Sequence, residues 1–156
     1  MLYIICALKS EAQAFVDKYK LPKSKQNTML TVVVSGIGKA NMFSATQKIV
    51  QKMSKDDIIV NIGICGANHT YKIGEIIDGF KEDLTCVDEA VSQDSIYTLV
   101  DMESCGFIDA SKEVKNRYIF KVVSDHFEPQ NITKEKTKQL IFNAIDNINK
   151  MFTIST

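Results

Sequence analysis

Apolar residues occur along this chain in short continuous runs, and stretches with apolar residues at helical spacing lie between several of the runs. A continuous apolar run is typical of a strand buried on both faces of a sheet, whereas helical spacing marks a helix with one buried face. The runs predict strands at Leu2–Leu8, Met29–Val34, Asp57–Ile62, Ile73–Ile77, Tyr97–Val100 and Tyr118–Val123. The periodic stretches predict helices at Ser10–Tyr19, Ala40–Met53, Met102–Ser111 and Thr133–Met151.

Local turn and cap signals separate these predicted elements. Ser10 is the expected N-cap of the first helix, because a serine hydroxyl can accept a backbone N–H of the first helical turn. Glycine turns are expected at 35–39 and 63–67, and a loop is expected at Pro129–Asn131. The acidic stretch 78–94 has no clear period, so no element is predicted within it.

The alternation of strands and helices predicts an α/β fold with a twisted, mostly parallel or mixed sheet and helices on both of its faces. At 156 residues the chain is expected to form one domain over 1–156, with a core that requires neither disulfides nor a metal. Met42, Ile49 and Met53 share one face of the second predicted helix. That face could pack against the sheet or against a second copy of the chain, and the pattern leaves both open.

Charge and composition narrow the class of partner. The 19 Lys and Arg residues balance 19 Asp and Glu residues, so the basic surface typical of nucleic-acid binding is absent and self-association is permitted. The N-terminus has no basic stretch before its apolar run, and no apolar stretch approaches the roughly 20 residues of a membrane span. We therefore expect a cytoplasmic protein without nucleic-acid or membrane partners.

The cysteines and histidines give no sign of a metal site. Cys6, Cys65, Cys86 and Cys105 include no C-x-x-C pair, which a zinc or redox motif would require. We expect all four to be free, reduced thiols. His126 has no accompanying set of metal-ligand residues, so a structural or solvated histidine is expected, and no metal or cofactor is predicted.

Three carboxylates come shortly after predicted strands: Glu11, Glu103 and Asp125. Ligands of open α/β sheets bind beyond the carboxyl ends of the strands, so these side chains are expected to converge on one rim beside the glycine turns. Each also has an ordinary structural explanation. Glu11 would stabilise the first turn of a helix, Asp125 could close a turn or cap a helix, and the neighbouring Met102 could simply pack in the core.

Four segments, taken in order, carry a more specific pattern: Ile4–Glu11; Val34–Ala40, which contains Ser-Gly-Ile-Gly-Lys; Ile59–Gly66 followed by Lys72–Ile77; and Val100–Glu103 followed by Val122–Asp125. This pattern resembles the nucleoside phosphorylase superfamily, and in particular its 5′-methylthioadenosine/S-adenosylhomocysteine nucleosidase branch. The resemblance implies a shortened phosphorylase/hydrolase fold, which is a three-layer α/β/α sandwich, and a homodimer.

Roles follow from the resemblance for the matching positions. It implies hydrolysis of the N-glycosidic bond of a purine nucleoside, with Asp125 as the general acid that protonates the base. Glu11 would orient or deprotonate the attacking water. Glu103 would accept hydrogen bonds from two ribose hydroxyls, and Met102 would pack against the sugar. Further substrate contacts are implied for Cys65, Gly66, Lys121 and Ser124.

The chain also departs from the family pattern. Ile64 stands where the family has Ser, Lys121 where it has Arg, and Asp101 where it has Glu. The segment 78–99 is much shorter than the corresponding segment of the family, so the chain is predicted to lack much of its purine pocket. A second copy of the chain could supply the missing wall.

Two functions therefore stay open. The favoured one is a nucleosidase that cleaves a purine nucleoside with water, and the alternative is a non-catalytic nucleoside-binding or interaction module on a degenerate scaffold. A phosphorylase is disfavoured, because Arg117 is the only arginine of the chain and Glu11 would repel phosphate.

Overall fold

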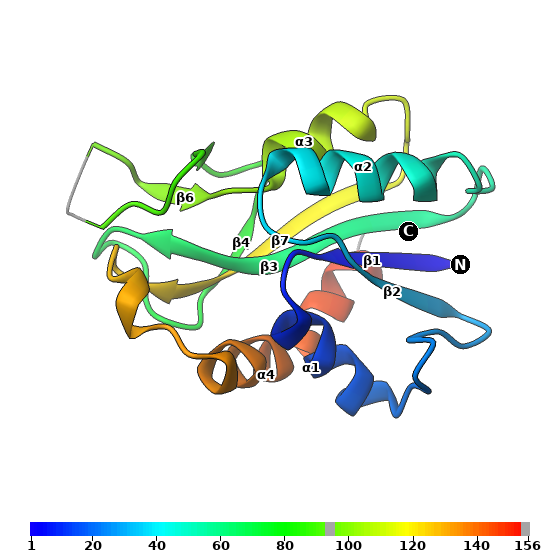
Figure 1. Ribbon diagram of the computed structural model, residues 1–156, viewed down its shortest axis with the longest axis horizontal. Helices are drawn as coiled ribbons and strands as arrows, with labels where there is room; N and C mark the ends of the chain where they lie inside the picture. Colours follow the sequence, from blue (N-terminus) through cyan, green and yellow to red (C-terminus); the bar gives the residue numbers. More distant parts are fainter. Residues whose placement is uncertain (93–95, 154–156) are drawn as a thin grey trace.

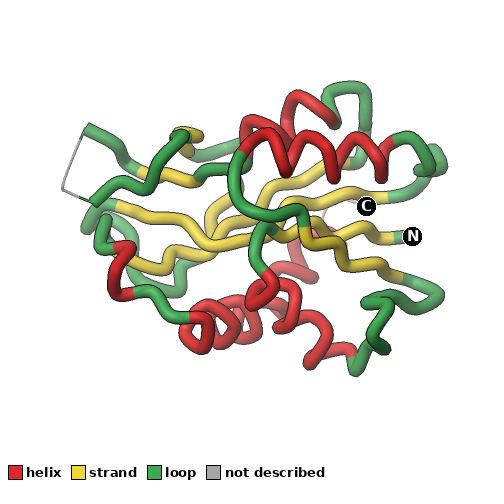
Figure 2. The backbone as a smooth tube through the Cα atoms, viewed as in Figure 1, coloured by secondary structure: helices red, strands yellow, loops and turns green. Residues whose placement is uncertain are grey.

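A twisted sheet lies between two layers of helices in the computed structural model, which describes residues 1–92 and 96–153 (Figure 1). The strands of the sheet are β1 (Leu2–Cys6), β2 (Leu30–Val34), β3 (Ile58–Ala67), β4 (Ile76–Asp78), β5 (Leu84–Cys86), β6 (Leu99–Asp101) and β7 (Arg117–Asp125). The helices are α1 (Lys9–Tyr19), α2 (Lys39–Val50), α3 (Ser104–Ala110) and α4 (Lys134–Thr153), with a short 3₁₀ turn, η1 (Pro129–Asn131). Helices α1 and α4 cover one face of the sheet and α2 and α3 the other (Figure 2).

The long strand β3 is the centre of the sheet. It pairs in parallel with β1 on one side and with β7 on the other, and β1 pairs in parallel with β2. Antiparallel pairs join β4 to β7 and β6 to the end of β3, while β5 lies parallel to β6. The sheet is therefore mixed, and the predicted three-layer α/β/α class is confirmed.

Alternating side chains of each central strand build two separate cores. Ile4 packs on the α1 and α4 side with Phe15, whereas Ile5 packs on the α2 and α3 side with Met42 and Ile49. Continuous apolar runs thus bury both faces of the strands, as expected for strands covered by helices on both sides. The apolar face of α2 is directed at the sheet, which settles the alternative that its pattern left open.

Strand β3 continues through the segment that the sequence predicts to be a glycine turn. The prediction at 63–67 is wrong, because β7 pairs with β3 as far as Gly66 and holds the backbone extended. The two glycines instead mark close approaches of side chains to the strand. A Cβ on Gly63 would lie 2.6 Å from Oε2 of Glu11, and a Cβ on Gly66 would lie 3.2 Å from Cγ2 of Val100.

Two other local predictions also change. Ser10 is not the N-cap of α1, because the helix begins at Lys9 and Leu8 occupies the cap position. The loop predicted at Pro129–Asn131 is one turn of 3₁₀ helix. Strand β5 is missing from the prediction because its three residues lie in the acidic stretch and are held by pairing with β6.

The expectation that all four cysteines are free thiols is wrong. Cys86 and Cys105 form a disulfide, with their Cα atoms 5.8 Å apart, whereas Cys6 and Cys65 are free and buried. The pairing depends on β5, whose Cys86 lies opposite Asp101 in β6, close to the start of α3. A separation of 19 positions in the sequence carries no information about that contact.

Candidate active site

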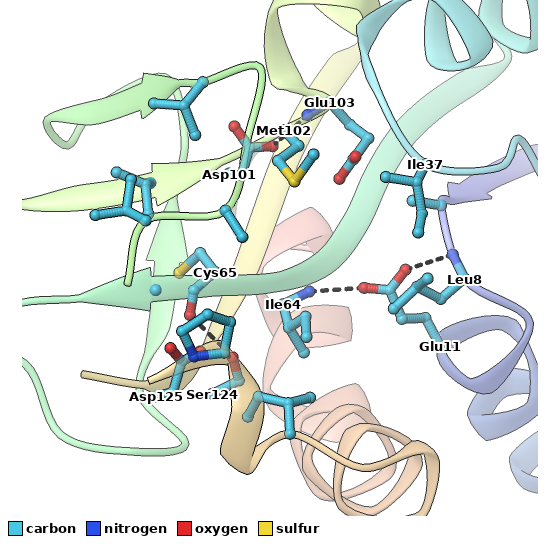
Figure 3. A pocket seen from close by; sticks show the side chains of 18 residues that line it. Leu8, Glu11, Ile37, Ile64, Cys65, Asp101, Met102, Glu103, Ser124 and Asp125 are labelled. Carbon is cyan, nitrogen blue, oxygen red and sulfur yellow. Dashed lines mark hydrogen bonds between the residues drawn. The ribbon is translucent and has the colours of Figure 1, made fainter. Parts of the chain in front are cut away.

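A pocket of about 340 Å³ opens at the carboxyl ends of β1, β3, β6 and β7 (Figure 3). It is lined by Ala7, Leu8, Glu11, Ile37, Ile64, Cys65, Gly66, Val87, Ala90, Val91, Val100, Asp101, Met102, Glu103, Ser124, Asp125, Pro129 and Ile132. Every residue that the sequence singles out for catalysis or substrate contact is among them except Lys121. The strand-end argument therefore leads to residues that line one pocket.

Glu11 projects from the first turn of α1, and two backbone N–H groups fix its carboxylate. Oε1 accepts the N–H of Leu8 at 2.8 Å, and Oε2 accepts the N–H of Ile64 at 2.8 Å (Figure 3). The absence of a side chain at Gly63 leaves the space that Oε2 occupies. Position 64 therefore serves the site through its backbone, so the replacement of Ser by Ile there leaves this contact intact.

Burial raises the pKa of Glu11 to about 7. The nearby ammonium group of Lys121 and the two backbone N–H donors oppose this rise, while the charge of Glu103 adds to it. Removal from water penalises the charged form of a carboxyl group, which is the cause of the rise. A carboxyl group with a pKa near neutrality is well matched to the task of taking a proton from water.

Glu103 enters the pocket just after β6, at the N-cap position of α3 (Figure 3). Its Oε2 accepts the N–H of Gly38 at 2.7 Å, which ties it to the glycine turn before α2. Burial raises the pKa of Glu103, while Lys121 and the Gly38 N–H act in the opposite direction. Met102 lies beside Glu103 on the same wall of the pocket.

Lys121 lies behind the pocket and forms a buried ion pair. Its Nζ is 3.0 Å from Oδ2 of Asp101, and its side chain is only 1% exposed. Burial by itself would lower the pKa of Lys121, but Asp101, Glu103 and Glu11 raise it above its ordinary value. Lys121 is thus a fixed positive charge among carboxylates, whereas the sequence predicts a direct contact with substrate.

Asp101 is the centre of the turn that carries Glu103. Besides the ion pair with Lys121, it accepts the hydroxyl of Ser104 at Oδ1 and the Ser104 N–H at Oδ2, at 2.5 and 2.8 Å. Oδ2 also lies 3.3 Å from the N–H of Glu103. Asp101 is one methylene shorter than the Glu of the family pattern, and its two carboxylate oxygens both have hydrogen-bond or ion-pair partners within the chain.

Asp125 ends β7 at the far side of the pocket from Glu11 and is partly exposed (Figure 3). Its Oδ1 accepts the hydroxyl of Ser124 at 2.6 Å, and its Oδ2 accepts the N–H of Glu128 at 2.8 Å. Asp125 therefore does close the turn that follows β7, as its ordinary structural explanation predicts. The Ser124 hydroxyl has a second acceptor in the carbonyl of Cys65, at 3.2 Å, so it can release Asp125 without being left unpaired.

An apolar wall, which the sequence does not reveal, faces these carboxylates. Val87, Ala90 and Val91 follow β5, and Ile132 follows η1. Val87, Ala90 and Val91 follow no period in the sequence, so only the tertiary structure assigns them to the pocket. Part of the short segment therefore lines the pocket, and residues 93–95 lie outside the described residues.

Charges in and around the pocket are predominantly negative. Within residues 1–92 and 96–153, no Lys, Arg or His lines it. The side chain of Arg117 donates to the carbonyl of Ile108 and lies over the ring of Phe80 instead. The same described ranges contain no cluster of three or more His, Cys, Asp or Glu suited to a metal ion, and no helix long and apolar enough to cross a membrane.

The fold is that of the 5′-methylthioadenosine/S-adenosylhomocysteine (MTA/SAH) nucleosidases. The Helicobacter pylori MTA/SAH nucleosidase, solved with butyl-thio-DADMe-Immucillin-A, matches with a TM-score of 0.75 at 11% identity, over 99% of this chain and 98% of that chain. A variant of the Chlamydia trachomatis nucleosidase matches with a TM-score of 0.73 at 21% identity, over 97% and 98%. The enzyme of Colwellia psychrerythraea in complex with adenine matches with a TM-score of 0.66 at 16% identity, over 93% and 94%.

Comparisons of sequence alone give no such match. No protein-family model matches the chain, and no curated protein sequence matches it. The resemblance inferred from the four segments is therefore confirmed by the fold.

Proposed function

We propose that this protein is a purine nucleoside N-ribohydrolase of the MTA/SAH nucleosidase type. The observation that carries the proposal is the placement of Glu11, Glu103 and Asp125, from three separate elements, around one pocket. The fold that surrounds the pocket adds support, because three nucleosidases share it over nearly their whole length. A pocket lined by carboxylates suits a reaction in which the ribosyl group gains positive charge at the transition state.

In the proposed reaction, Asp125 donates a proton to a ring nitrogen of the base, and the C–N bond breaks with its electron pair leaving on the base. Water adds to the ribosyl carbon and gives its proton to Glu11, whose pKa of about 7 suits it for this role. Glu103 accepts hydrogen bonds from the ribose hydroxyls, and Met102 packs against the sugar. The products are the free base and the free sugar.

Ser124 can serve Asp125 before and after the proposed proton transfer. When Asp125 is ionised, the Ser124 hydroxyl donates to it at 2.6 Å. When Asp125 is protonated, the same hydroxyl can donate to the Cys65 carbonyl at 3.2 Å and accept from Asp125. Ser124 thus accommodates both protonation states that a general acid must adopt.

Water is the proposed acceptor in preference to phosphate. Phosphate needs positive charge or several N–H donors, and the described lining holds no basic side chain. The buried Lys121 is engaged with Asp101. A phosphate dianion near Glu11 and Glu103 would also meet repulsion from both carboxylates.

The proposed substrate carries adenine, because nucleosidases of the same fold are solved with adenine and with 8-aminoadenine. Val87 and Val91 offer an apolar surface against which a purine ring can lie. We further propose that the protein is cytoplasmic and homodimeric and that residues 1–156 form one domain.

The test is release of free base from purified protein incubated with methylthioadenosine, S-adenosylhomocysteine, adenosine and inosine, with and without phosphate. The expected result is release of base that needs no phosphate and that an Asp125→Asn variant loses. Asp109→Asn is the matched control, because Asp109 is exposed on α3 and does not line the pocket. Release that depends on phosphate would contradict the assignment of water as the acceptor.

A second candidate function is nucleoside binding without catalysis. It is favoured by Asp125, whose two carboxylate oxygens both accept hydrogen bonds within the chain, as a purely structural residue would. Measurements of adenine binding and of base release distinguish the two candidate functions. Adenine binding without base release from any of the four nucleosides would support the binding module.

A further inference from the structure

The disulfide between Cys86 and Cys105 encloses a loop, residues 86–105, that carries much of the pocket. Seven lining residues belong to this loop: Val87, Ala90, Val91, Val100, Asp101, Met102 and Glu103. They include three residues of the apolar wall, Val87, Ala90 and Val91, and Glu103, the carboxylate proposed for the ribose. The disulfide therefore joins the two ends of the segment that is proposed to contact the ligand.

The disulfide ties the start of the segment that carries Val87, Ala90 and Val91 to α3. Cys86 ends β5, a strand of three residues paired with the equally short β6. Val87 adds one backbone hydrogen bond, from its N–H to the carbonyl of Asp101 at 2.8 Å. The surface ion pair between Lys39 and Asp88, at 3.1 Å, has both side chains more than half exposed and contributes little to stability.

The two bonded cysteines are also less buried than the two free ones. Both Cys86 and Cys105 are partly exposed, whereas the free thiols Cys6 and Cys65 are buried. Exchange between a thiol and a disulfide requires that a thiolate reach one of the sulfurs. The two bonded cysteines are therefore better placed than Cys6 or Cys65 to meet a thiolate from solvent.

We propose that Cys86–Cys105 is a redox modification site that sets the affinity of the pocket for its nucleoside. The co-reactant is a dithiol, either a small molecule or a protein. One thiolate of the dithiol attacks one sulfur of the disulfide and forms a mixed disulfide, and the second thiol displaces the cysteine. Two electrons and two protons pass to Cys86 and Cys105, and the dithiol becomes a disulfide.

Reduction frees the end of β5 from the start of α3 and loosens the apolar wall. Binding of the base weakens, because ordering the loop then costs conformational entropy that the disulfide has already removed. Glu11 and Asp125 lie outside the loop, on α1 and β7, so the chemical step is affected less than binding. The identity of the ligand in this inference rests on the proposed function.

The effect must also be reciprocal. If the oxidised protein binds adenine about tenfold more tightly than the reduced protein, bound adenine shifts the equilibrium of the disulfide with a dithiol by about the same factor. A merely structural disulfide far from the ligand would show no such coupling.

The experiment measures adenine binding by titration calorimetry on full-length protein after oxidation with glutathione disulfide and after reduction with dithiothreitol. Thiols are counted in denaturant in each state. We expect two thiols in the oxidised protein, four in the reduced protein, and about tenfold weaker adenine binding on reduction. Cys105→Ser should bind adenine like the reduced protein and should not respond to the reductant.

Cys6→Ala is the control, because Cys6 is buried in the core on α1's side of the sheet and should leave the ratio between the two states unchanged. Four thiols in the oxidised sample, or equal adenine affinity in the two states, overturns the redox inference and leaves the proposed function in place. Absence of adenine binding in both states overturns the nucleoside assignment, and the redox inference with it, while the thiol count still reports whether the bond forms.

Discussion

The Glu11 side of the pocket rests on α1 and on β3, a strand of ten residues that pairs with β1 and β7. The Glu103 side rests on β5 and β6, which have three residues each, and on a disulfide. The Glu11 side is therefore held by the centre of the sheet, whereas the Glu103 side is held by two short strands and a disulfide. The group proposed to activate water, which tolerates little movement, thus lies on the rigid side of the pocket. The wall proposed to recognise the ligand lies on the side built from short strands.

The carboxylates on the two ends of the pocket also differ in environment. Glu11 is buried, and its pKa of about 7 arises mainly from the loss of hydration. Asp125 is partly exposed and keeps a hydroxyl and an N–H as partners. The carboxyl groups proposed as base and as acid therefore lie in unlike surroundings.

The largest expected effect comes from Glu11→Gln, which removes the proposed base. Base release should fall by about 10²–10⁴-fold, the usual contribution of a positioned acid or base. In the parent protein, kcat/KM should drop about tenfold per unit as pH falls below about 7, because protonation of Glu11 removes the active form. Glu135→Gln, at an exposed position of α4, is the control. An unchanged pH profile in Glu11→Gln would falsify the assignment.

Lys121→Met tests the charge that lies between the two sides of the pocket. The free energy of unfolding should fall by about 3–5 kcal/mol, because Asp101 is left buried without its partner. Urea denaturation measures this loss, and adding Asp101→Asn should recover part of it. Lys138→Met, which breaks a partly exposed pair with Asp17, should change stability by about 1 kcal/mol or less. Equal losses in the two single variants would contradict a special role for the buried pair.

Gly63→Ala tests the fixed position of Glu11 without changing its chemistry. The added Cβ would lie 2.6 Å from Oε2 of Glu11 and 3.4 Å from Nζ of Lys121, so the carboxylate must shift. A displacement of this size should lower kcat by about 10²-fold. The same change made in Glu11→Gln should have little further effect on base release. Additive losses would show that Gly63 acts on something other than Glu11.

Ser124→Ala should give the smallest of these effects, because it removes only a partner of Asp125. We expect a decrease of about tenfold in kcat/KM, the scale of one hydrogen bond to a charged group, with the fold intact by circular dichroism. Ser124→Thr keeps the hydroxyl and should retain more activity than the alanine variant. Equal activity in the two variants would remove Ser124 from the proposed proton transfer.

Sequence patterns predicted most of the elements of this fold because its core strands are apolar on both faces and its helices are amphipathic. They also led to Glu11, Glu103 and Asp125, since the carboxyl ends of neighbouring strands meet at one edge. They failed at 63–67, where glycines usually signal a turn. Pairing with β7 overrides that local preference and keeps the segment extended.

Gly106 is a second glycine whose role the local sequence pattern does not predict. Within a helix it is expected only to weaken the element. In the structure, a Cβ there would clash with the backbone of Lys39, so the glycine permits α3 to pack against the start of α2. That packing brings the Gly38 N–H to Glu103. Gly106 thus permits a contact between α3 and α2 that the local sequence does not indicate.

The sequence by itself determined the class of fold, the two-sided burial of the central strands and the edge of the sheet where carboxylates gather, because these depend on local periodicity and strand order. Only the tertiary structure decided that Lys121 pairs with Asp101, that Cys86 joins Cys105 and that Val87 and Val91 form a wall. Those contacts join residues brought together by the pairing of β5 with β6 and by the packing of β7 behind the pocket. Distance along the chain says nothing about them, because they arise only when the whole sheet has formed.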